Sequence, residues 1–391
     1  MLVTVKNSVS ASSRKAFSVF SKLLRNNFAT QETATFEVRP FKLHKLDSGP
    51  STTVTVSKDE AVKMYKQMST IRRLETACGA LYKEKIVRGF CHLYSGQEAC
   101  CVGMKAAMRG NDAVITAYRD HGWAYVMDIS VESILAELTV KSLVAQEEKE
   151  AACICTMKNF LEEMALWVPR LNTSTNERVF LCKVPVGAGV ALAYQYLNTG
   201  GVCIALYGDG AANQGQVFEA YNMAALWKIP VIFVCENNGY GMGTSAERAA
   251  ASTSYYTRGD YIPGIWIDGM DVLAVKEATK YAIDFCTSGK GPILMEVATY
   301  RYSGHSMSDP GTSYRTREEV QEVRQTRDPK IDQEIRKSVD AAVAFCKADK
   351  EVGPEELTAD IYSEPLESQI RGITAFESHP HMRIGRAINK Q

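Results

Sequence analysis

The fold of this chain is decided by the stretch VCIALYGDGAANQGQVFEAYNMAALWKIPVIFVCENN, residues 202–238. It contains two continuous apolar runs, 202–206 and 231–235, which are typical of strands buried on both faces of a parallel sheet. Residues 216–228 between them carry apolar side chains at helical spacing, and Pro230 ends that helix. The stretch therefore predicts a strand, a crossover helix and a second parallel strand.

Other segments extend this pattern in both directions. Ser57 and Glu60 form a capping box that opens a long helix, and residues 113–115 form a short apolar run that predicts a strand. Asp271 can cap the start of a helix that runs to Cys286, and residues 292–297 predict a third buried strand. Strands alternating with helices indicate an α/β fold with a parallel sheet and helices on both faces.

Two polar side chains follow the first two strands at the point where each strand ends. Asp209 and Asn238 should lie close together, because the carboxyl ends of neighbouring parallel strands meet at one edge of the sheet. Carboxylate and amide oxygens suit magnesium, which commonly bridges phosphates. Gly208 and Gly210 allow a tight turn, and the next helix start offers N–H groups to an anion. The pattern predicts a magnesium-bridged diphosphate.

Composition excludes several classes of protein. The 391 residues contain 45 basic and 45 acidic side chains, which gives no reason to expect nucleic acid as a partner. No apolar run approaches the roughly 20 residues of a membrane helix. The 11 cysteines form no paired Cys-x-x-Cys motifs, so free buried thiols are expected and a zinc site is not. No Gly-x-Gly-x-x-Gly follows a strand, which argues against a nicotinamide cofactor.

The N-terminal residues 1–31 differ from the rest of the chain. They are basic and rich in serine, they lack acidic residues, and they could form an amphipathic helix. This composition is typical of a mitochondrial presequence, with a disordered basic tail as the alternative. We therefore expect a presequence over residues 1–30 and a single domain over 31–391.

A second group of polar residues surrounds a histidine after the third strand. The loop YRYSGHSMSDPGTSYRTR, residues 300–317, holds His305, a residue type suited to proton transfer near neutral pH. Together with residues 208–244 and 57–139, this loop resembles the alpha subunits of mitochondrial thiamine-diphosphate-dependent 2-oxoacid dehydrogenases. Residues 213–225 and 302–309 resemble the pyruvate branch of that family, and the branched-chain 2-oxoacid branch is the alternative.

The resemblance implies a thiamine-diphosphate-binding fold, thiamine diphosphate and Mg2+ as cofactors, and a set of site residues. It implies oxidative decarboxylation of pyruvate and transfer of the acetyl unit to a lipoyl group. His305 and His92 would be catalytic. The metal ligands would be Asp209, Asn238 and the backbone oxygen of Tyr240. The cofactor would contact Tyr118, Arg119, Asp209, Gly210, Ala211, Asn238 and His305.

The resemblance also implies partners and regulation. A beta subunit would complete a heterotetramer and supply the cofactor-activating glutamate, so this chain alone would be inactive. Further partners would be a lipoyl acyltransferase core and a regulatory kinase and phosphatase in the mitochondrial matrix. Phosphorylation would fall on Ser306, Ser313 and Ser245. A phosphate next to a diphosphate site would repel the anion and disorder the loop.

Two places depart from the family pattern. Residues 140–183 stand where the family has a glycine-rich segment around the cofactor, and no glycine lies between Gly122 and Gly187. At Pro329 and Lys330, a short family segment is absent. These departures keep a second alternative open, namely a catalytically impaired variant that binds partners only.

Overall fold

A computed structural model describes residues 33–87, 89–139, 183–312, 314–327, 333–349, 369–371 and 378–380. The expected presequence lies outside these residues. The same holds for residues 140–182 of the atypical segment and for the junction at residues 329 and 330.

A six-stranded sheet in the order β2-β7-β8-β6-β5-β4 forms the centre of the fold. Its strands are β2 (Lys42–His44), β4 (Ala113–Ile115), β5 (Cys203–Gly208), β6 (Val231–Asn237), β7 (Gly264–Asp268) and β8 (Ile293–Ala298). All neighbours pair in parallel except β2, which runs antiparallel to β7 at one edge. The predicted parallel sheet is therefore confirmed.

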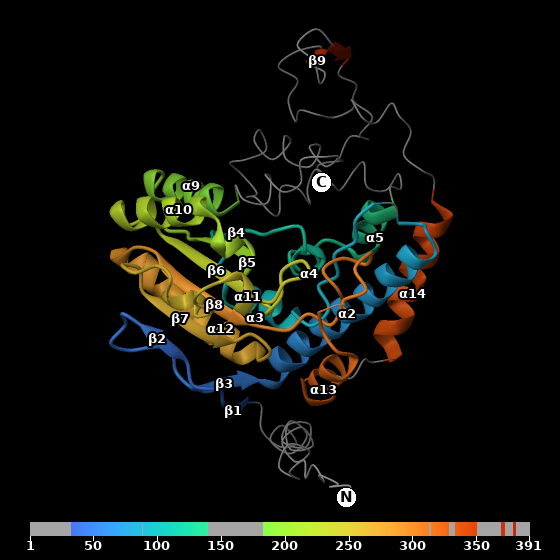
Figure 1. Ribbon diagram of the computed structural model, residues 1–391, viewed down its shortest axis with the longest axis horizontal. Coiled ribbons are helices and arrows are strands. Elements are labelled where there is room, and N and C mark those ends of the chain that lie inside the picture. Colours follow the sequence, from blue (N-terminus) through green and yellow to red (C-terminus); the bar gives the residue numbers. More distant parts are fainter. Residues whose placement is uncertain are drawn as a thin grey trace, which may run out of the picture.

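Helices cover both faces of this sheet, as predicted (Figure 1). On one face lie α9 (Lys183–Tyr196) and α10 (Gly215–Leu226), which pack over the apolar side chains of β5 and β6. On the other face lie α3 (Glu98–Ala107) and α12 (Val272–Phe285), which pack against each other and over β7 and β8. Each large apolar side chain that the strands bury on these faces stabilises the fold by about 1.5–3 kcal/mol.

The long helix α2 (Lys58–Lys83) runs beside the sheet, and several shorter helices pack against it (Figure 1). It packs against α3, α4 (His121–Val126), α5 (Val131–Thr139) and α14 (Gln333–Ala348). The remaining α-helices and strands of the described residues are β1 (Thr33–Glu37), β3 (Thr53–Ser57), α11 (Ala246–Ala249), α13 (Arg317–Arg327), β9 (Gln369–Arg371) and β10 (Ser378–Pro380). None of the helices in the described ranges is long and apolar enough to cross a membrane.

Local signals in the sequence place the helix starts correctly. The Ser57 hydroxyl accepts a hydrogen bond from the Glu60 N–H and begins α2. The Asp271 carboxylate accepts from the N–H groups of Leu273 and Ala274 and begins α12. Each cap satisfies backbone donors that have no partner within the helix, which is worth about 1 kcal/mol.

Candidate active site

Two neighbouring strands bring the expected metal ligands together. β5 ends directly before Asp209 and β6 ends directly before Asn238, and the two strands pair in parallel. Both side chains are buried at the carboxyl edge of the sheet. Burial raises the pKa of the Asp209 carboxyl, although backbone N–H groups and the charge of Arg301 oppose the rise. A buried carboxylate in this position is stabilised by a bound cation.

Arg301 already places a positive charge on these oxygens. Its side chain is 1% exposed, and its Nη1 donates to Asn238 Oδ1 at 3.3 Å and to the Tyr240 backbone oxygen at 3.2 Å. These atoms are two of the three ligands expected from the sequence. Burial lowers the pKa of Arg301 to about 10, and repulsion by Arg119 adds to this. Oxygens that accept hydrogen bonds from a cationic group are also suitable ligands for a hard divalent cation, so the residues present fit such an ion.

Two histidines and a tyrosine form a ring cluster next to this edge. The centroids of the His92 and Tyr118 rings lie 4.4 Å apart, and those of His92 and His305 lie 5.3 Å apart. His92 Nδ1 is 2.9 Å from the His305 backbone oxygen. His305 Nδ1 is buried and has no hydrogen-bond partner among the described residues. The cluster therefore presents an unused imidazole nitrogen to a ligand.

Both imidazoles are neutral at physiological pH. Burial, followed by repulsion from Arg119, lowers the pKa of His305 to about 3. Burial also lowers the pKa of His92 to about 4, with Arg119 again contributing. The Arg119 guanidinium donates to the backbone oxygens of Leu93 and His305, at 2.6 and 2.9 Å, and so joins the two loops. A neutral imidazole held in this way can donate one proton and accept another.

The loop after His305 is organised around one carboxylate. Asp309 accepts hydrogen bonds from the backbone N–H groups of His305 and Gly311, at 2.7 and 2.8 Å, and from the Tyr314 hydroxyl. Burial opposes ionisation, but these hydrogen bonds outweigh it and lower the pKa of Asp309. Ser306 is buried in the same loop, and its hydroxyl lies 2.6 Å from that of Ser308. A buried hydroxyl in a loop that an ionised carboxylate holds together is an unfavourable place for added negative charge.

Gly96 lets the loop that carries His92 touch the loop that carries His305. Its φ is +102°, and an added Cβ would lie 2.1 Å from the Tyr300 backbone oxygen. We expect Gly96→Ala to lower the free energy of unfolding by at least about 2 kcal/mol, because neither the backbone nor its neighbour can accommodate a methyl group. Urea denaturation measures the loss. Gly189→Ala on α9 is the control, since no described atom beyond its chain neighbours and the backbone of its own helix lies within 4 Å of the added Cβ. Equal stability of the two variants would contradict the prediction.

A second buried carboxyl lies on β6, close to the site. The Tyr94 hydroxyl donates to Glu236 Oε1 at 2.7 Å, and burial raises the pKa of Glu236 to about 7. In the unfolded chain a glutamate titrates near 4.3. Between these values the folded chain binds more protons than the unfolded chain. This carboxyl therefore lowers the stability as the pH rises through that interval.

Glu236→Gln should remove this pH dependence. The neutral amide can still accept from Tyr94, so we expect the variant to gain about 3 kcal/mol over the parent chain at pH 8 and little near pH 4. Denaturation by urea at both pH values measures the difference. Glu219→Gln, at an exposed position on α10, is the matched control. If both substitutions gave the same change with pH, the burial of Glu236 would not be the cause.

The other residues expected from the sequence fall around this site. Gly210 and Ala211 follow Asp209 where the chain enters a 3-10 turn, residues 211–213. Ser245 caps α11, and its hydroxyl accepts from the Arg248 N–H at 3.3 Å. Ser313 lies outside the described residues. No role was expected for Arg301 or Glu236; the sequence signal is a charge within the apolar strand β6 for Glu236, and a charge shortly after the apolar strand β8 for Arg301.

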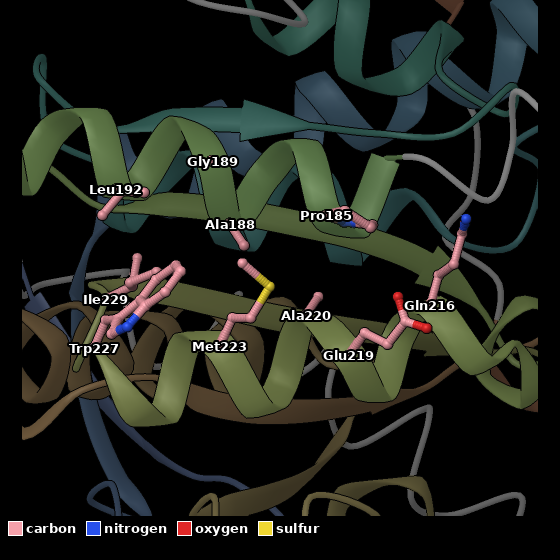
Figure 2. Close-up of a pocket in the computed structure, with 10 residues that line it drawn as sticks. All are labelled: Pro185, Ala188, Gly189, Leu192, Gln216, Glu219, Ala220, Met223, Trp227 and Ile229. Atoms are coloured by element: carbon pink, nitrogen blue, oxygen red, sulfur yellow. The ribbon is translucent and has the colours of Figure 1, made fainter.

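A separate groove lies between α9 and α10 (Figure 2). Its lining residues are Pro185, Ala188, Gly189, Leu192, Gln216, Glu219, Ala220, Met223, Trp227 and Ile229. It shares no residue with the candidate active site, and Glu219 is the one ionisable side chain among those that line it. Met223 and Trp227 are each 45% exposed, so the groove opens on an apolar surface.

The fold is an α/β fold with a mostly parallel sheet, and the carboxyl edge of the sheet brings together a carboxylate, an amide oxygen and a backbone oxygen, which suit a hard cation. The model of the dehydrogenase E1 component family matches residues 66–334, and the chain belongs to this family. Membership implies thiamine diphosphate with a divalent metal, Mg2+, as cofactors.

Named relatives are similar over most of their length. The probable pyruvate dehydrogenase E1 component subunit alpha, mitochondrial, of Caenorhabditis elegans is 55% identical over 363 residues, 88% of each chain. The type II alpha subunit of the pyruvate dehydrogenase E1 component of Ascaris suum is 53% identical, over 87% of this chain and 89% of that one. The human somatic form is 49% identical, over 95% of this chain and 96% of the human chain. These names favour neither the branched-chain nor the impaired alternative.

Proposed function

We propose that this chain is the alpha subunit of a mitochondrial pyruvate dehydrogenase E1 component. It would act in the oxidative decarboxylation of pyruvate and the transfer of the acetyl unit to lipoyl groups. The observation that carries the proposal is the pair Asp209 and Asn238 at adjacent strand ends, with a cation already placed between Asn238 and Tyr240. The names of the relatives supply the substrate, pyruvate.

The metal would be held by the Asp209 carboxylate, Asn238 Oδ1 and the Tyr240 backbone oxygen. On metal binding, the Arg301 guanidinium would lose its hydrogen bonds to two of these oxygens and would be available to pair with a neighbouring anion. The backbone of Gly210 and Ala211, which follows Asp209 directly, would contact the diphosphate. When bound, thiamine diphosphate supplies the nucleophilic carbon and the electron sink for decarboxylation, and the chain supplies binding and orientation.

The ring cluster would donate and accept protons on the side of the site that faces the substrate. His92 and His305 are neutral, and Arg119 joins their two loops by hydrogen bonds to the backbone. His305 Nδ1, buried without a partner among the described residues, is the nitrogen best placed to bind or donate a proton to a ligand. Tyr118, with its hydroxyl 3.5 Å from His305 Nε2, orients the ring from the other side.

The chain would act together with a partner subunit, in the mitochondrial matrix. The exposed apolar groove between α9 and α10 supports association with another subunit, since apolar surface of this kind is favourably buried in an interface (Figure 2). We propose a beta subunit in a heterotetramer, docked on a lipoyl acyltransferase core and regulated by a kinase and a phosphatase at Ser306, Ser313 and Ser245. Residues 1–30 would direct import into the mitochondrial matrix, and residues 31–391 would form one domain.

Substrate profiling tests the proposed reaction. The full-length chain, co-expressed with a beta subunit, should decarboxylate pyruvate with kcat/KM at least about tenfold above that for 3-methyl-2-oxobutanoate, because a pocket for a methyl group excludes a branched side chain. The matched preparation with Asp209→Asn should be inactive towards both acids. Equal or reversed preference would reject pyruvate as the substrate. No turnover of either acid would favour a chain that binds partners only.

A further inference from the structure

Three potential metal-ligating side chains meet at a place that the proposed reaction does not use. Glu75 and Cys78 lie one turn apart on α2, and His121 is the first residue of α4. One ligand atom from each residue lies within 4.8 Å of the other two. Glu75 and Cys78 are fully buried and His121 is 8% exposed. Two helices that pack against each other thus bring a carboxylate, a thiol and an imidazole to one point.

One carboxylate oxygen in this cluster is left without a hydrogen bond. Glu75 Oε1 lies 3.0 Å from His121 Nδ1, but Glu75 Oε2 is buried and has no partner among the described residues. An unsatisfied buried carboxylate oxygen costs several kcal/mol, so such atoms normally face a donor or a cation. Glu75 Oε2 is therefore a second, independent sign of a missing ligand.

We propose that Glu75, Cys78 and His121 bind a zinc ion. Thiolate and imidazole are the preferred ligands of zinc, a carboxylate oxygen completes many zinc sites, and neither magnesium nor calcium favours sulfur. The charges also balance, because a thiolate and a carboxylate together neutralise one divalent ion. Expectations from cysteine spacing miss such a site, since it holds one cysteine and takes its third ligand from another helix.

Zinc binding at this cluster must displace protons. Burial would lower the pKa of His121, but the charge of Glu75 outweighs it and raises that pKa to about 9, with Asp120 and Glu137 adding to the effect. Burial raises the pKa of the Cys78 thiol, and the charge of Glu75 raises it further. At neutral pH both groups therefore hold a proton. When the metal–sulfur and metal–nitrogen bonds form, one S–H and one N–H bond break, and both protons pass to the buffer.

A zinc ion at this site would fix the position of the start of α4, which directly follows the segment that holds Arg119. His121 follows two residues after Arg119, whose guanidinium joins the loops of Leu93 and His305. Zinc would tie this segment to α2 through two ligands on that helix. The inference does not depend on the proposed reaction, because none of the three residues touches the expected metal ligands at the sheet edge.

Metal analysis of the full-length chain, co-expressed with a beta subunit, tests the proposal. The protein is stripped with a chelator, loaded with zinc, desalted and analysed for metal content. The parent chain should retain one zinc ion per alpha chain at this cluster, and Cys78→Ala should lose it. Cys286→Ala removes another buried thiol and should keep the ion, as should Asp209→Asn, which changes the proposed magnesium site instead. Equal zinc content in the parent chain and Cys78→Ala would overturn the proposal.

Calorimetry on the parent chain gives a second readout that does not require a variant to fold. Zinc is titrated in two buffers with different heats of protonation. The difference should report the release of at least one proton, that of the Cys78 thiol, for each ion bound. Binding without proton release would contradict ligation by Cys78 and His121, even if metal analysis found one ion.

Discussion

Asp209→Asn should lower the affinity of the chain for magnesium by at least about a hundredfold and turnover in step with it. Loss of a hydrogen bond to a metal ligand already costs about 10- to 100-fold in affinity, and this substitution removes a charged ligand itself. The measurement is the rate of pyruvate decarboxylation as a function of Mg2+ concentration, with the beta subunit present. A variant that reached full rate at the parent's magnesium concentration would contradict the role of Asp209.

The same variant should remain folded. Burial raises the pKa of Asp209, which means that the ionised carboxylate lowers the stability of the folded chain. A neutral amide of the same shape removes this destabilisation. We therefore expect Asp209→Asn to unfold at the parent's temperature or above it in the absence of cofactor. Asp284→Asn, at an exposed position on α12, is the control for loss of one charge and should change neither property.

Ser306→Glu should lower activity at least about tenfold below Ser306→Gln, which has the same size and no charge. Ser306 is buried, and its hydroxyl is 2.6 Å from that of Ser308 in the loop that Asp309 holds together. A second carboxylate in this loop would repel Asp309 and the diphosphate of a bound cofactor, and a repulsion of about 1.4 kcal/mol is enough for a tenfold loss.

The comparison separates charge from crowding. Steady-state rates of the complex with the beta subunit give the activities, and limited proteolysis of the 303–311 loop reports its order. If Ser306→Glu and Ser306→Gln were equally impaired, the size of the side chain would be responsible. Control of this loop by phosphorylation would then lose its physical basis.

The positions of strands in the sequence were predictable where the strands are long and buried on both faces. β5, β6 and β8 are continuous apolar runs with clear ends, and their boundaries differ from the expected ones by a residue or two. β7 and β2 were not predicted. β7 is short, with the half-buried Trp266 at its centre, and β2 pairs with it from more than 200 residues away. No local pattern encodes such a partner.

The candidate site was predictable to the same degree. Asp209 and Asn238 follow strands that the apolar runs identify, so their meeting follows from the rule that ligands bind at the carboxyl ends of parallel strands. Arg301 was not predicted, because its contact with Asn238 forms only when a loop 63 residues away folds back over the sheet edge. The zinc ligands Glu75 and His121 meet across 46 residues for the same reason.

Calorimetry with thiamine diphosphate tests whether the chain binds this cofactor through magnesium. The full-length chain, co-expressed with a beta subunit and freed of cofactor, is titrated with thiamine diphosphate in the presence and absence of Mg2+. We predict one binding event for each alpha chain, dependent on Mg2+ and lost in Asp209→Asn. Absence of binding at millimolar thiamine diphosphate with Mg2+ present would contradict the account.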